Sequence, residues 1–323
     1  MSEMTNSIGA LYAYDVDGRG RGWRLDPEHI PAPKDGDGYR WVHLDMDHPG
    51  AEAWIAAQAD PLVAEALTIE DTRPRYFRFG EGFLLNLRGV NLNPASDPED
   101  MVSIRLWACG RLIVSARRRL MAVVALREAL EAGAGPQTPG RFIAALSEGL
   151  TERMAPVVDG VADEVDALEE TSLDSAAGLR ASLVDIRRTT IVLRRYIGPQ
   201  RDALGRLAGE SGDFFDAADQ TRLRETIDRI TRLVEEMDAV RERCAVLNDQ
   251  LADARAEEMN RNMMVLSVVA AIFLPLGFLT GLLGVNVGGV PGADNPYAFA
   301  LLCLLMTLVG LGITLFFRKL KWI

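Results

Sequence analysis

A glycine-rich segment near the C-terminus holds the residues best suited to meet a metal cation. Residues 284–292 read Gly-Val-Asn-Val-Gly-Gly-Val-Pro-Gly and follow an apolar stretch directly. Glycine allows close approach of the backbone, and the side-chain carbonyl of Asn286 and its neighbouring backbone carbonyls are hard oxygen donors, suited to a cation that keeps its water shell. Several copies around an axis would form a neutral, oxygen-lined mouth. The same composition also fits a simple turn between two helices.

Two histidines and two aspartates near the N-terminus form a second group of potential metal ligands. They are His43, Asp45, Asp47 and His48. Imidazole and carboxylate groups at such short spacing could hold a regulatory divalent cation. The residues at positions 42, 44 and 46 are apolar, however, and this alternation is also typical of a strand with one face in water. Both interpretations are open, and the solvated strand face is the simpler one.

Three further carboxylates flank the apolar C-terminal part of the chain. Asp294 follows the glycine-rich segment, and Glu257 and Glu258 precede the first apolar stretch. Repeated in several copies, these charges would raise the local concentration of cations. Each also fits an ordinary solvated position, in a turn for Asp294 and on a helix face for the two glutamates.

Two apolar stretches enclose the glycine-rich segment and predict a helical hairpin in a membrane. Residues 263–283 and 297–317 are each about twenty residues long, which matches a bilayer core of roughly 30 Å, and no charged residue occurs from position 262 to 293. Basic residues precede the first stretch and follow the second, whereas the connector has none. They are Arg255, Arg261, Arg318, Lys319 and Lys321. This distribution predicts a membrane protein with both termini cytoplasmic and the connector outside.

The sequence before the hairpin predicts a cytoplasmic α/β domain over residues 1–135, with a mixed sheet and flanking helices. No N-terminal leader is recognisable, so this part is expected to stay in the cytoplasm. Short apolar or alternating runs between turn residues indicate the strands, and two helices interrupt them. The expected strands are 10–14, 40–44, 76–79, 83–90, 102–108 and 112–115, and the expected helices are 51–59 and 61–70.

Long helices are predicted over residues 136–260, and a transmembrane domain over 261–323. Helical periodicity covers 141–171 and 179–207, and Gly198-Pro199 is expected to bend or break the second helix. Residues 213–274 contain neither proline nor glycine, which predicts one helix of about 60 residues that continues into the membrane. The transmembrane domain divides into spans at 263–283 and 297–317, an outer loop at 284–296 and a basic cytoplasmic tail at 318–323.

Several classes of function are disfavoured by composition. The net charge is −11 and no basic run is interleaved with aromatic residues, so a nucleic-acid partner is not expected. The longest basic run, residues 117–119, fits a solvated junction. The three cysteines are far apart in the sequence, which indicates no disulfide framework. No nucleophile elbow, P-loop, dinucleotide fingerprint or HExxH motif occurs, so an enzyme is not expected.

The order of these features resembles the CorA superfamily of metal ion transporters, in which Gly-x-Asn ends the first of two C-terminal spans. In the magnesium branch the middle residue is usually Met and a Tyr precedes the motif, whereas here Leu283 precedes Gly284-Val285-Asn286. That departure and the following Val-Gly-Gly-Val-Pro-Gly are similar to the ZntB branch, which is concerned with zinc transport. The segments Asp-Thr-Arg-Pro-Arg at 71–75 and Leu-Leu-Asn-Leu-Arg-Gly-Val-Asn at 84–91 also resemble that branch.

The resemblance covers nearly the whole chain and implies a funnel-shaped homopentamer with a central pore. It implies a selectivity mouth at Gly284, Val285 and Asn286. The implied pore-lining residues are Asn260, Met263, Leu266, Ala270, Leu274, Gly277 and Gly281. Steps of three and four residues place them on one helical face, although small residues on one face also mediate tight helix packing.

The resemblance therefore implies transport of divalent cations, Zn²⁺ first, by a homopentamer in the lipid bilayer of the bacterial inner membrane, with no cofactor besides the transported ion. Dedicated zinc sites use Cys, His or carboxylate ligands, and the first span has none of these, so the ion is expected to pass partly hydrated. Transport of Mg²⁺, Co²⁺ or Ni²⁺ is the alternative within the superfamily. A membrane-anchored oligomeric scaffold or sensor without transport is the alternative outside it. The residues alone leave the direction of transport and any coupling to protons open.

Overall fold

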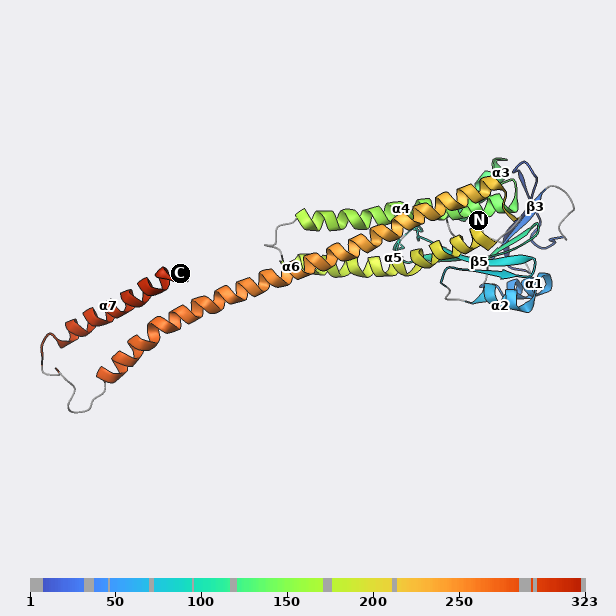
Figure 1. Ribbon diagram of the computed structural model, residues 1–323. Coiled ribbons are helices and arrows are strands. Elements are labelled where there is room, and N and C mark those ends of the chain that lie inside the picture. Colours follow the sequence, from blue (N-terminus) through green and yellow to red (C-terminus); the bar gives the residue numbers. More distant parts are fainter. Residues whose placement is uncertain are drawn as a thin grey trace. The chain divides into compact units, whose positions relative to one another are not determined.

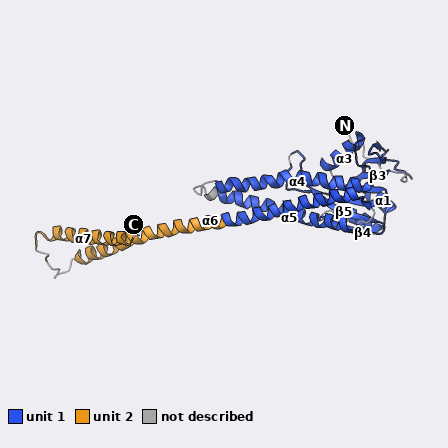
Figure 2. Ribbon diagram, turned by 45° about the horizontal axis from the view of Figure 1, so that its top comes forward, with its two compact units in different colours: residues 1–247 blue, residues 248–323 orange. Residues whose placement is uncertain are grey.

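The computed structural model describes residues 8–31, 38–45, 47–69, 73–94, 96–116, 121–170, 176–210, 214–284, 292 and 295–320. The chain divides into two compact units, Met1–Leu247 and Asn248–Ile323, which are described separately (Figure 2). The division falls within one helix, α6 (Ala217–Leu283). The domain boundaries predicted from the sequence, near residues 135 and 260, mark changes in the residue pattern and do not coincide with this division.

The first unit contains a seven-stranded mixed sheet (Figure 1). The strand order is β2-β1-β3-β7-β6-β5-β4, and among these strands β3 and β7 form the parallel pair. The strands are β1 (Ala10–Val16), β2 (Gly22–Arg24), β3 (Tyr39–Leu44), β4 (Arg75–Phe79), β5 (Gly82–Gly89), β6 (Val102–Cys109) and β7 (Leu112–Ala116). The mixed α/β fold and all six expected strands are confirmed, each strand to within two residues at either end. The short strand β2 was not expected.

Two short helices cover one face of the sheet. Both α1 (Pro49–Gln58) and α2 (Pro61–Thr68) begin with proline, which suits the first helical position because its missing N–H has no helical partner there. The side chains of His48 and Asp60 cap the two helices by accepting hydrogen bonds from backbone N–H groups of the first turn. The core beneath them includes Val42, Leu44, Ile55, Leu67 and Val114.

The other face of the sheet carries the aromatic residues that alternate with this core. Trp41 precedes Val42 on β3 and therefore points to the opposite face. Its ring lies 4.9 Å from that of Phe142, between centroids, and Phe142 belongs to α4 (Pro139–Glu170). The sheet is thus enclosed between the short helices on one side and longer helices on the other.

Long helices extend from this second face. The helices α4 and α5 (Ala176–Glu210) lie side by side, together with the N-terminal part of α6, and α3 (Met121–Glu131) precedes them (Figures 1 and 2). Each helix contributes a stripe of apolar side chains that are at most 6% exposed, and burial of one such side chain stabilises the fold by about 1.5–3 kcal/mol. The stripes include Leu150, Met154, Val161, Leu193, Ile197, Ile230 and Met237.

The expected break in α5 is wrong, because this helix continues through Gly198 and Pro199. Proline removes one hydrogen bond to the carbonyl four residues earlier, here that of Arg195, which is exposed and can be solvated. Leu193 and Ile197, before the proline, and Leu204, after it, are almost fully buried. Packing on both sides of the proline therefore holds the helix in one piece.

The second unit contains the C-terminal part of α6 and the helix α7 (Ala298–Lys319). By length and composition, α6 and α7 are the two described helices able to cross a membrane. The predicted long helix is confirmed, since α6 is continuous over 67 residues. Its end at Leu283 and the start of α7 at Ala298 agree with the spans expected from the sequence.

Candidate functional site

The residues predicted to line a pore lie on one exposed face of α6. They are Asn260, Met263, Leu266, Ala270, Leu274, Gly277 and Gly281, and all seven are exposed. At about 100° per residue they fall within an arc of roughly 120°. The exposed fractions of Met263, Leu266 and Leu274 are 58%, 68% and 73%. We call these seven residues the predicted pore face.

The helix α7 covers the other side of α6. Val268 is 7% exposed, and Ala271, Ile272 and Leu276 are half-buried. A β-carbon placed on Gly310 of α7 would lie 3.8 Å from Cδ1 of Leu276, which is ordinary contact. The covered residues centre roughly 160° around the helix from the predicted pore face. Within one chain, α7 therefore leaves the predicted pore face free.

Two glycines of this face have open space where a side chain would be. Apart from the adjacent backbone of α6 itself, no atom of the described residues lies within 4 Å of a β-carbon placed on Gly277 or Gly281. Small residues in membrane helices often permit close helix packing, but these two do not pack against α7 of the same chain. They are available to a central passage or to another copy.

The start of the predicted selectivity mouth shows why glycine ends the helix. The backbone N–H of Gly284 donates to the carbonyl of Thr280, with N and O 2.9 Å apart. A β-carbon on Gly284 would lie only 2.7 Å from that carbonyl oxygen. A larger residue cannot take this position without a shift of the backbone. Val285, Asn286 and Asp294 lie outside the described residues.

The polar groups in this part of α6 are largely satisfied within the helix. The hydroxyl of Thr280 donates to the carbonyls of Leu276 and Gly277, at 3.1 and 3.0 Å. Pro275 supplies no N–H to the ladder, yet α6 continues through it to Leu283. The described part of the predicted pore face thus offers apolar side chains and glycines, with Asn260 as its polar member.

Glu257 and Glu258 do not share this face. Both are exposed, and each lies roughly 130° around the helix from the centre of the predicted pore face. Their carboxylates are therefore directed away from the line of Met263 and Leu274. An effect on cations at these positions would be a contribution to the local field and not direct contact along the face.

The four predicted ligands of the N-terminal domain have separate roles. The ring of His43 is 2% exposed, stacks on Tyr12 with centroids 4.8 Å apart, and lies 2.8 Å from Oγ of Ser115 through Nδ1. Asp45 accepts a hydrogen bond from the backbone N–H of Asp47, and His48 caps α1. The structure does not bring these side chains together around one point. The expectation of a wet strand face is wrong for His43, which is buried among aromatic rings.

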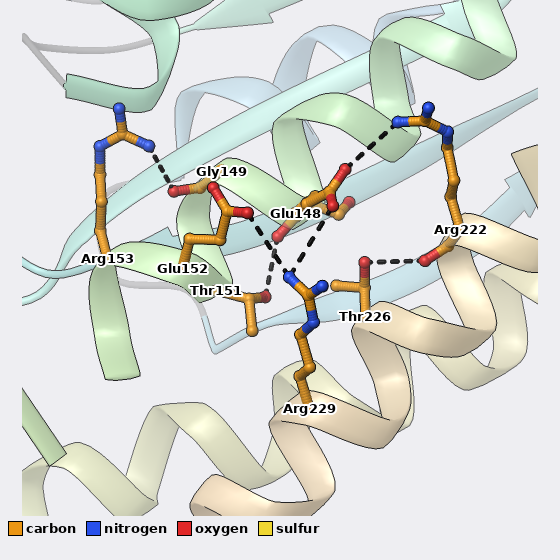
Figure 3. Close-up of polar contacts among 9 residues, drawn as sticks. Glu148, Gly149, Thr151, Glu152, Arg153, Arg222, Thr226 and Arg229 are labelled. Carbon is orange, nitrogen blue, oxygen red and sulfur yellow. Dashed lines mark hydrogen bonds and ion pairs between the residues drawn. The ribbon is translucent and has the colours of Figure 1, made fainter. Parts of the chain in front are cut away.

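An ionic cluster between α4 and α6 was not expected from the sequence (Figure 3). Arg222 Nη1 lies 3.5 Å from Glu148 Oε2, and Arg229 Nη1 lies 3.8 Å from Glu148 Oε1 and 3.4 Å from Glu152 Oε1. The pairs were discernible only as spacings, because the glutamates are one helical turn apart and the arginines two turns apart. Which helices meet cannot be deduced from such spacings.

A hollow of about 420 Å³ lies beside this cluster. Its lining combines the apolar residues Ala155 and Leu233 with several charged side chains. The lining residues are Thr151, Glu152, Ala155 and Asp159 of α4 and Arg229, Arg232, Leu233 and Glu236 of α6. Among the described residues, no group of three or more His, Cys, Asp or Glu side chains is arranged to hold a metal ion.

A second ionic contact ties α6 to the end of α4. Arg243 Nε and Nη2 donate to the two carboxylate oxygens of Glu169, at 2.8 and 2.7 Å, and Nη2 also contacts Asp166. The hydrogen bonds from Arg243 lower the pKa of Glu169. The contact adds positional specificity to the apolar packing of α4 and α6.

The described structure has a large N-terminal α/β domain, long connecting helices and two C-terminal helices that are long and apolar enough to cross a membrane. A family model described as "CorA-like Mg2+ transporter protein" matches residues 36–319. The chain therefore belongs to the CorA family, which is a family of ion transporters.

Individual relatives support this assignment over the whole length of the chain. The divalent cation transporter CmaX of Pseudomonas aeruginosa is 40% identical over 331 residues, and the alignment covers 99% of each chain. The zinc transport protein ZntB of Yersinia enterocolitica is 34% identical over 319 residues, covering 97% of this chain and 96% of that protein. The structure of full-length CmaX matches with a TM-score of 0.82 at 40% identity, covering 98% of this chain and 99% of the other.

Proposed function

We propose that five copies of this chain form a central pathway for divalent cations, Zn²⁺ first, across the bacterial inner membrane. The observation that carries the proposal is the uncharged, exposed face of α6 that α7 of the same chain leaves free and that runs to Gly284. Because the chain belongs to the CorA family of ion transporters, we expect this face to line the pathway of the ion. The number of copies follows from the family resemblance.

The choice of Zn²⁺ is supported by the residues of the mouth and by the relatives. The motif Gly284-Val285-Asn286 has Val at its centre and Leu before it, a departure from the magnesium branch and a likeness to the ZntB branch. One relative is named as a zinc transport protein and another as a divalent cation transporter. Transport of Mg²⁺, Co²⁺ or Ni²⁺ is the alternative.

The proposed pathway selects by size and hydration rather than by tight binding. Residues 262–293 contain no Cys, His, Asp, Glu, Lys or Arg, so no zinc-ligating side chain is available there. Five copies of the Asn286 amide and its neighbouring carbonyls would hold a partly hydrated cation. Met263, Leu266 and Leu274 would form rings that exclude water in the closed state.

The proposed topology places both termini in the cytoplasm. Arg318 and Lys319 end α7, and Arg255 and Arg261 precede the apolar part of α6, as the rule for cytoplasmic basic residues requires. Asp294 would then lie in the outer connector, where five copies would attract cations. The bilayer and the other copies are the partners of this chain, and the divalent cation is its cargo.

Flux into liposomes tests the proposal. Purified protein is reconstituted into vesicles that contain a dye sensitive to the cation under test, and uptake of Zn²⁺, Mg²⁺, Co²⁺ and Ni²⁺ is compared with and without a pH gradient. We expect Zn²⁺ uptake by the native chain and at least a tenfold loss in Asn286→Ala. The matched control is Asn262→Ala, which changes the same residue type on α6 roughly 90° from the centre of the predicted pore face.

The controls also separate transport from anchoring. Native mass spectrometry establishes that each variant still assembles. An assembled native chain that carries none of these ions would favour a membrane-anchored scaffold or sensor. Equal flux in Asn286→Ala and Asn262→Ala would contradict the assignment of the mouth.

A further inference from the structure

We propose that α4 of one copy packs against α5 of the next copy through two oppositely charged stripes. This inference deepens the proposed function, since it requires several copies around one axis. It concerns the first unit alone and names the residues by which neighbouring copies recognise each other. All of the residues concerned are exposed or line the hollow between α4 and α6.

The outer face of α4 is acidic. Five carboxylates fall within an arc of about 60°, on the side away from the buried residues Met154, Val158, Val161 and Val165. They are Glu152, Asp159, Asp163, Asp166 and Glu170, and all are exposed. Glu152 and Asp166 pair with arginines of α6 and are still 55% and 59% exposed. Asp159 and Asp163 form no ion pair with any described residue of the same chain.

The outer face of α5 is basic and carries two exposed aliphatic residues. Four arginines fall within an arc of about 100°, away from the buried residues Leu183, Ile186, Leu193 and Ile197. The stripe consists of Arg180, Val184, Arg187, Arg188, Ile191 and Arg195, and all are exposed. Val184 and Ile191 lie seven residues apart on the same face of α5. They are 61% and 53% exposed although both side chains are aliphatic. None of the four arginines forms an ion pair with a described residue of the same chain.

The charged residues of the two stripes lie at matching distances along the helix axes, counted from the end of α4 and from the start of α5. Asp166 lies four residues before the end of α4 at Glu170, and Arg180 lies four residues after the start of α5 at Ala176. Asp159 and Arg187 lie eleven residues from the same ends. Because both helices rise about 1.5 Å per residue, opposite charges occur at equal heights. Copies related by rotation about an axis along the hairpin therefore bring acid against base.

The hollow beside α4 provides a place for an apolar side chain of the neighbour. Ala155 in its lining is 15 residues before the end of α4, and Ile191 is 15 residues after the start of α5. Leu233 adds a second apolar group to the lining. Ile191 of one copy thus meets the hollow of the next, with its flanking arginines at the carboxylates of the rim. Exposed ion pairs contribute little one by one, so this apolar contact and the repeated charges act together.

The arrangement favours a ring over a twofold dimer. Each copy carries one acidic and one basic stripe on different helices, so each can bind a neighbour on both sides. Contacts between unlike surfaces generate rings when the rotation closes, whereas a twofold dimer requires a self-complementary surface. A second copy is therefore a better occupant than a lipid surface, which would be attracted by the arginines and repelled by the carboxylates.

Disulfide cross-linking of the full chain in membrane vesicles tests the contact. In a chain in which Cys109, Cys244 and Cys303 are replaced, we introduce Ala155→Cys in one tagged copy and Ile191→Cys in another. Oxidation is expected to yield dimers between the two tags. The matched control pairs Ala155→Cys with Leu62→Cys, at an equally exposed leucine of α2, and should yield none.

Charge reversal tests how far the two stripes contribute to this cross-link. Asp159→Lys with Asp163→Lys is expected to lower the yield of dimers at least fivefold. Adding Arg187→Glu with Arg188→Glu in the other copy should restore it, because the charges are again opposite. Loss without restoration would contradict direct pairing of the stripes.

The cross-linking experiment and the flux experiment can fail separately. Assembled protein without Ala155–Ile191 dimers, or with cross-links only to other molecules, would overturn this surface and leave transport untouched. Specific dimers in a chain that carries no cation would support the surface and contradict the transport proposal.

Discussion

Arg194 of α5 and Asp238 of α6 form a two-point ion pair across 44 residues of sequence. Arg194 Nε lies 2.5 Å from Oδ1 of Asp238, and Nη2 lies 2.9 Å from Oδ2. Such parallel hydrogen bonds fix the relative orientation of both groups. The pair holds α5 and α6 in register beside their shared apolar core, which includes Leu193 and Met237.

Replacing Asp238 by Asn should weaken this contact and change its response to pH. The hydrogen bonds from Arg194 lower the pKa of Asp238 below its ordinary value of 3.8. The contribution to stability is therefore complete above that value and is lost as the pH falls through the lowered pKa. We expect Asp238→Asn to cost about 0.2–1 kcal/mol at neutral pH, the range measured for solvent-exposed pairs.

Thermal unfolding of the detergent-solubilised chain, followed by tryptophan fluorescence, measures this change. Asp202→Asn is the matched control, because Asp202 pairs with its exposed neighbour Arg201 and joins no two helices. Equal destabilisation in both variants, or in Asp238→Asn at every pH, would contradict the assignment.

The long helices and the strands could be predicted because their periodicity is local. The apolar steps of α4 and α6 appear in the sequence itself, as does the apolar run Phe-Leu-Leu in β5. The three residues of β2 are too few to show a period, and they pair with β1 only because the chain turns back at Gly20, whose φ is +86°. Gly20 takes this conformation more readily than other residues would.

Contacts between distant parts of the chain could not be deduced in the same way. Glu148 and Arg229 meet only because α4 and α6 lie at one particular register, and no local pattern specifies that register. The burial of His43 depends on the aromatic ring of Tyr12 on a neighbouring strand. The residues of the predicted pore face could be assigned from the family resemblance, and their spacing places them on one helix face. That α7 leaves this face free could be established only from the position of the second helix.

A buried carboxylate at the start of α6 should give a pH response of the opposite sign. Asp219 is 1% exposed, and burial, followed by the nearby charge of Asp216, raises its pKa above the ordinary 3.8, against the opposing effect of Arg141. The folded chain therefore holds this proton more tightly than the unfolded chain. Its contribution to stability is greatest below pH 3.8 and declines as the pH rises through the raised pKa.

The variant Asp219→Asn should remove this decline. Stability of the variant relative to the native chain is expected to increase as the pH rises from 3.8 towards neutrality. Unfolding curves at a series of pH values provide the measurement, with the exposed Asp185→Asn as control. A constant difference between variant and native chain across that range would show that Asp219 titrates as it does in the unfolded chain.

The guanidinium of Arg88 stacks on a ring of α5 and joins the sheet to the long helices. Its Cζ lies 4.0 Å from the ring centroid of Tyr196, and Nη1 donates to the carbonyl of Met101 at 2.8 Å. Tyr196→Leu should cost about 0.5–2 kcal/mol, because a cation near an aromatic face is stabilised by the ring's electron density. Tyr196→Phe keeps the ring and should be nearly neutral. Chemical denaturation distinguishes the two, and similar losses in both would indicate that the hydroxyl matters instead.

The last prediction concerns water in the proposed pathway. Leu274 lies on the predicted pore face and is 73% exposed in the single chain. If five copies form a closed apolar ring at this level, Leu274→Ser should wet the ring and raise resting cation flux several-fold, since a polar lining removes the barrier that dewetting creates. The matched control is Leu282→Ser. This leucine is 57% exposed and lies roughly 105° around the helix from the centre of the predicted pore face.

Dye-loaded liposomes report both variants at the same protein density. The leak through Leu274→Ser should occur for several divalent cations alike, because the ring excludes water and does not recognise a particular ion. An equal leak in Leu282→Ser would indicate general disruption of the helices. Unchanged flux in Leu274→Ser, with Asn286→Ala still inactive, would place the closed constriction elsewhere on the face, with Met263 and Leu266 as the next residues to substitute.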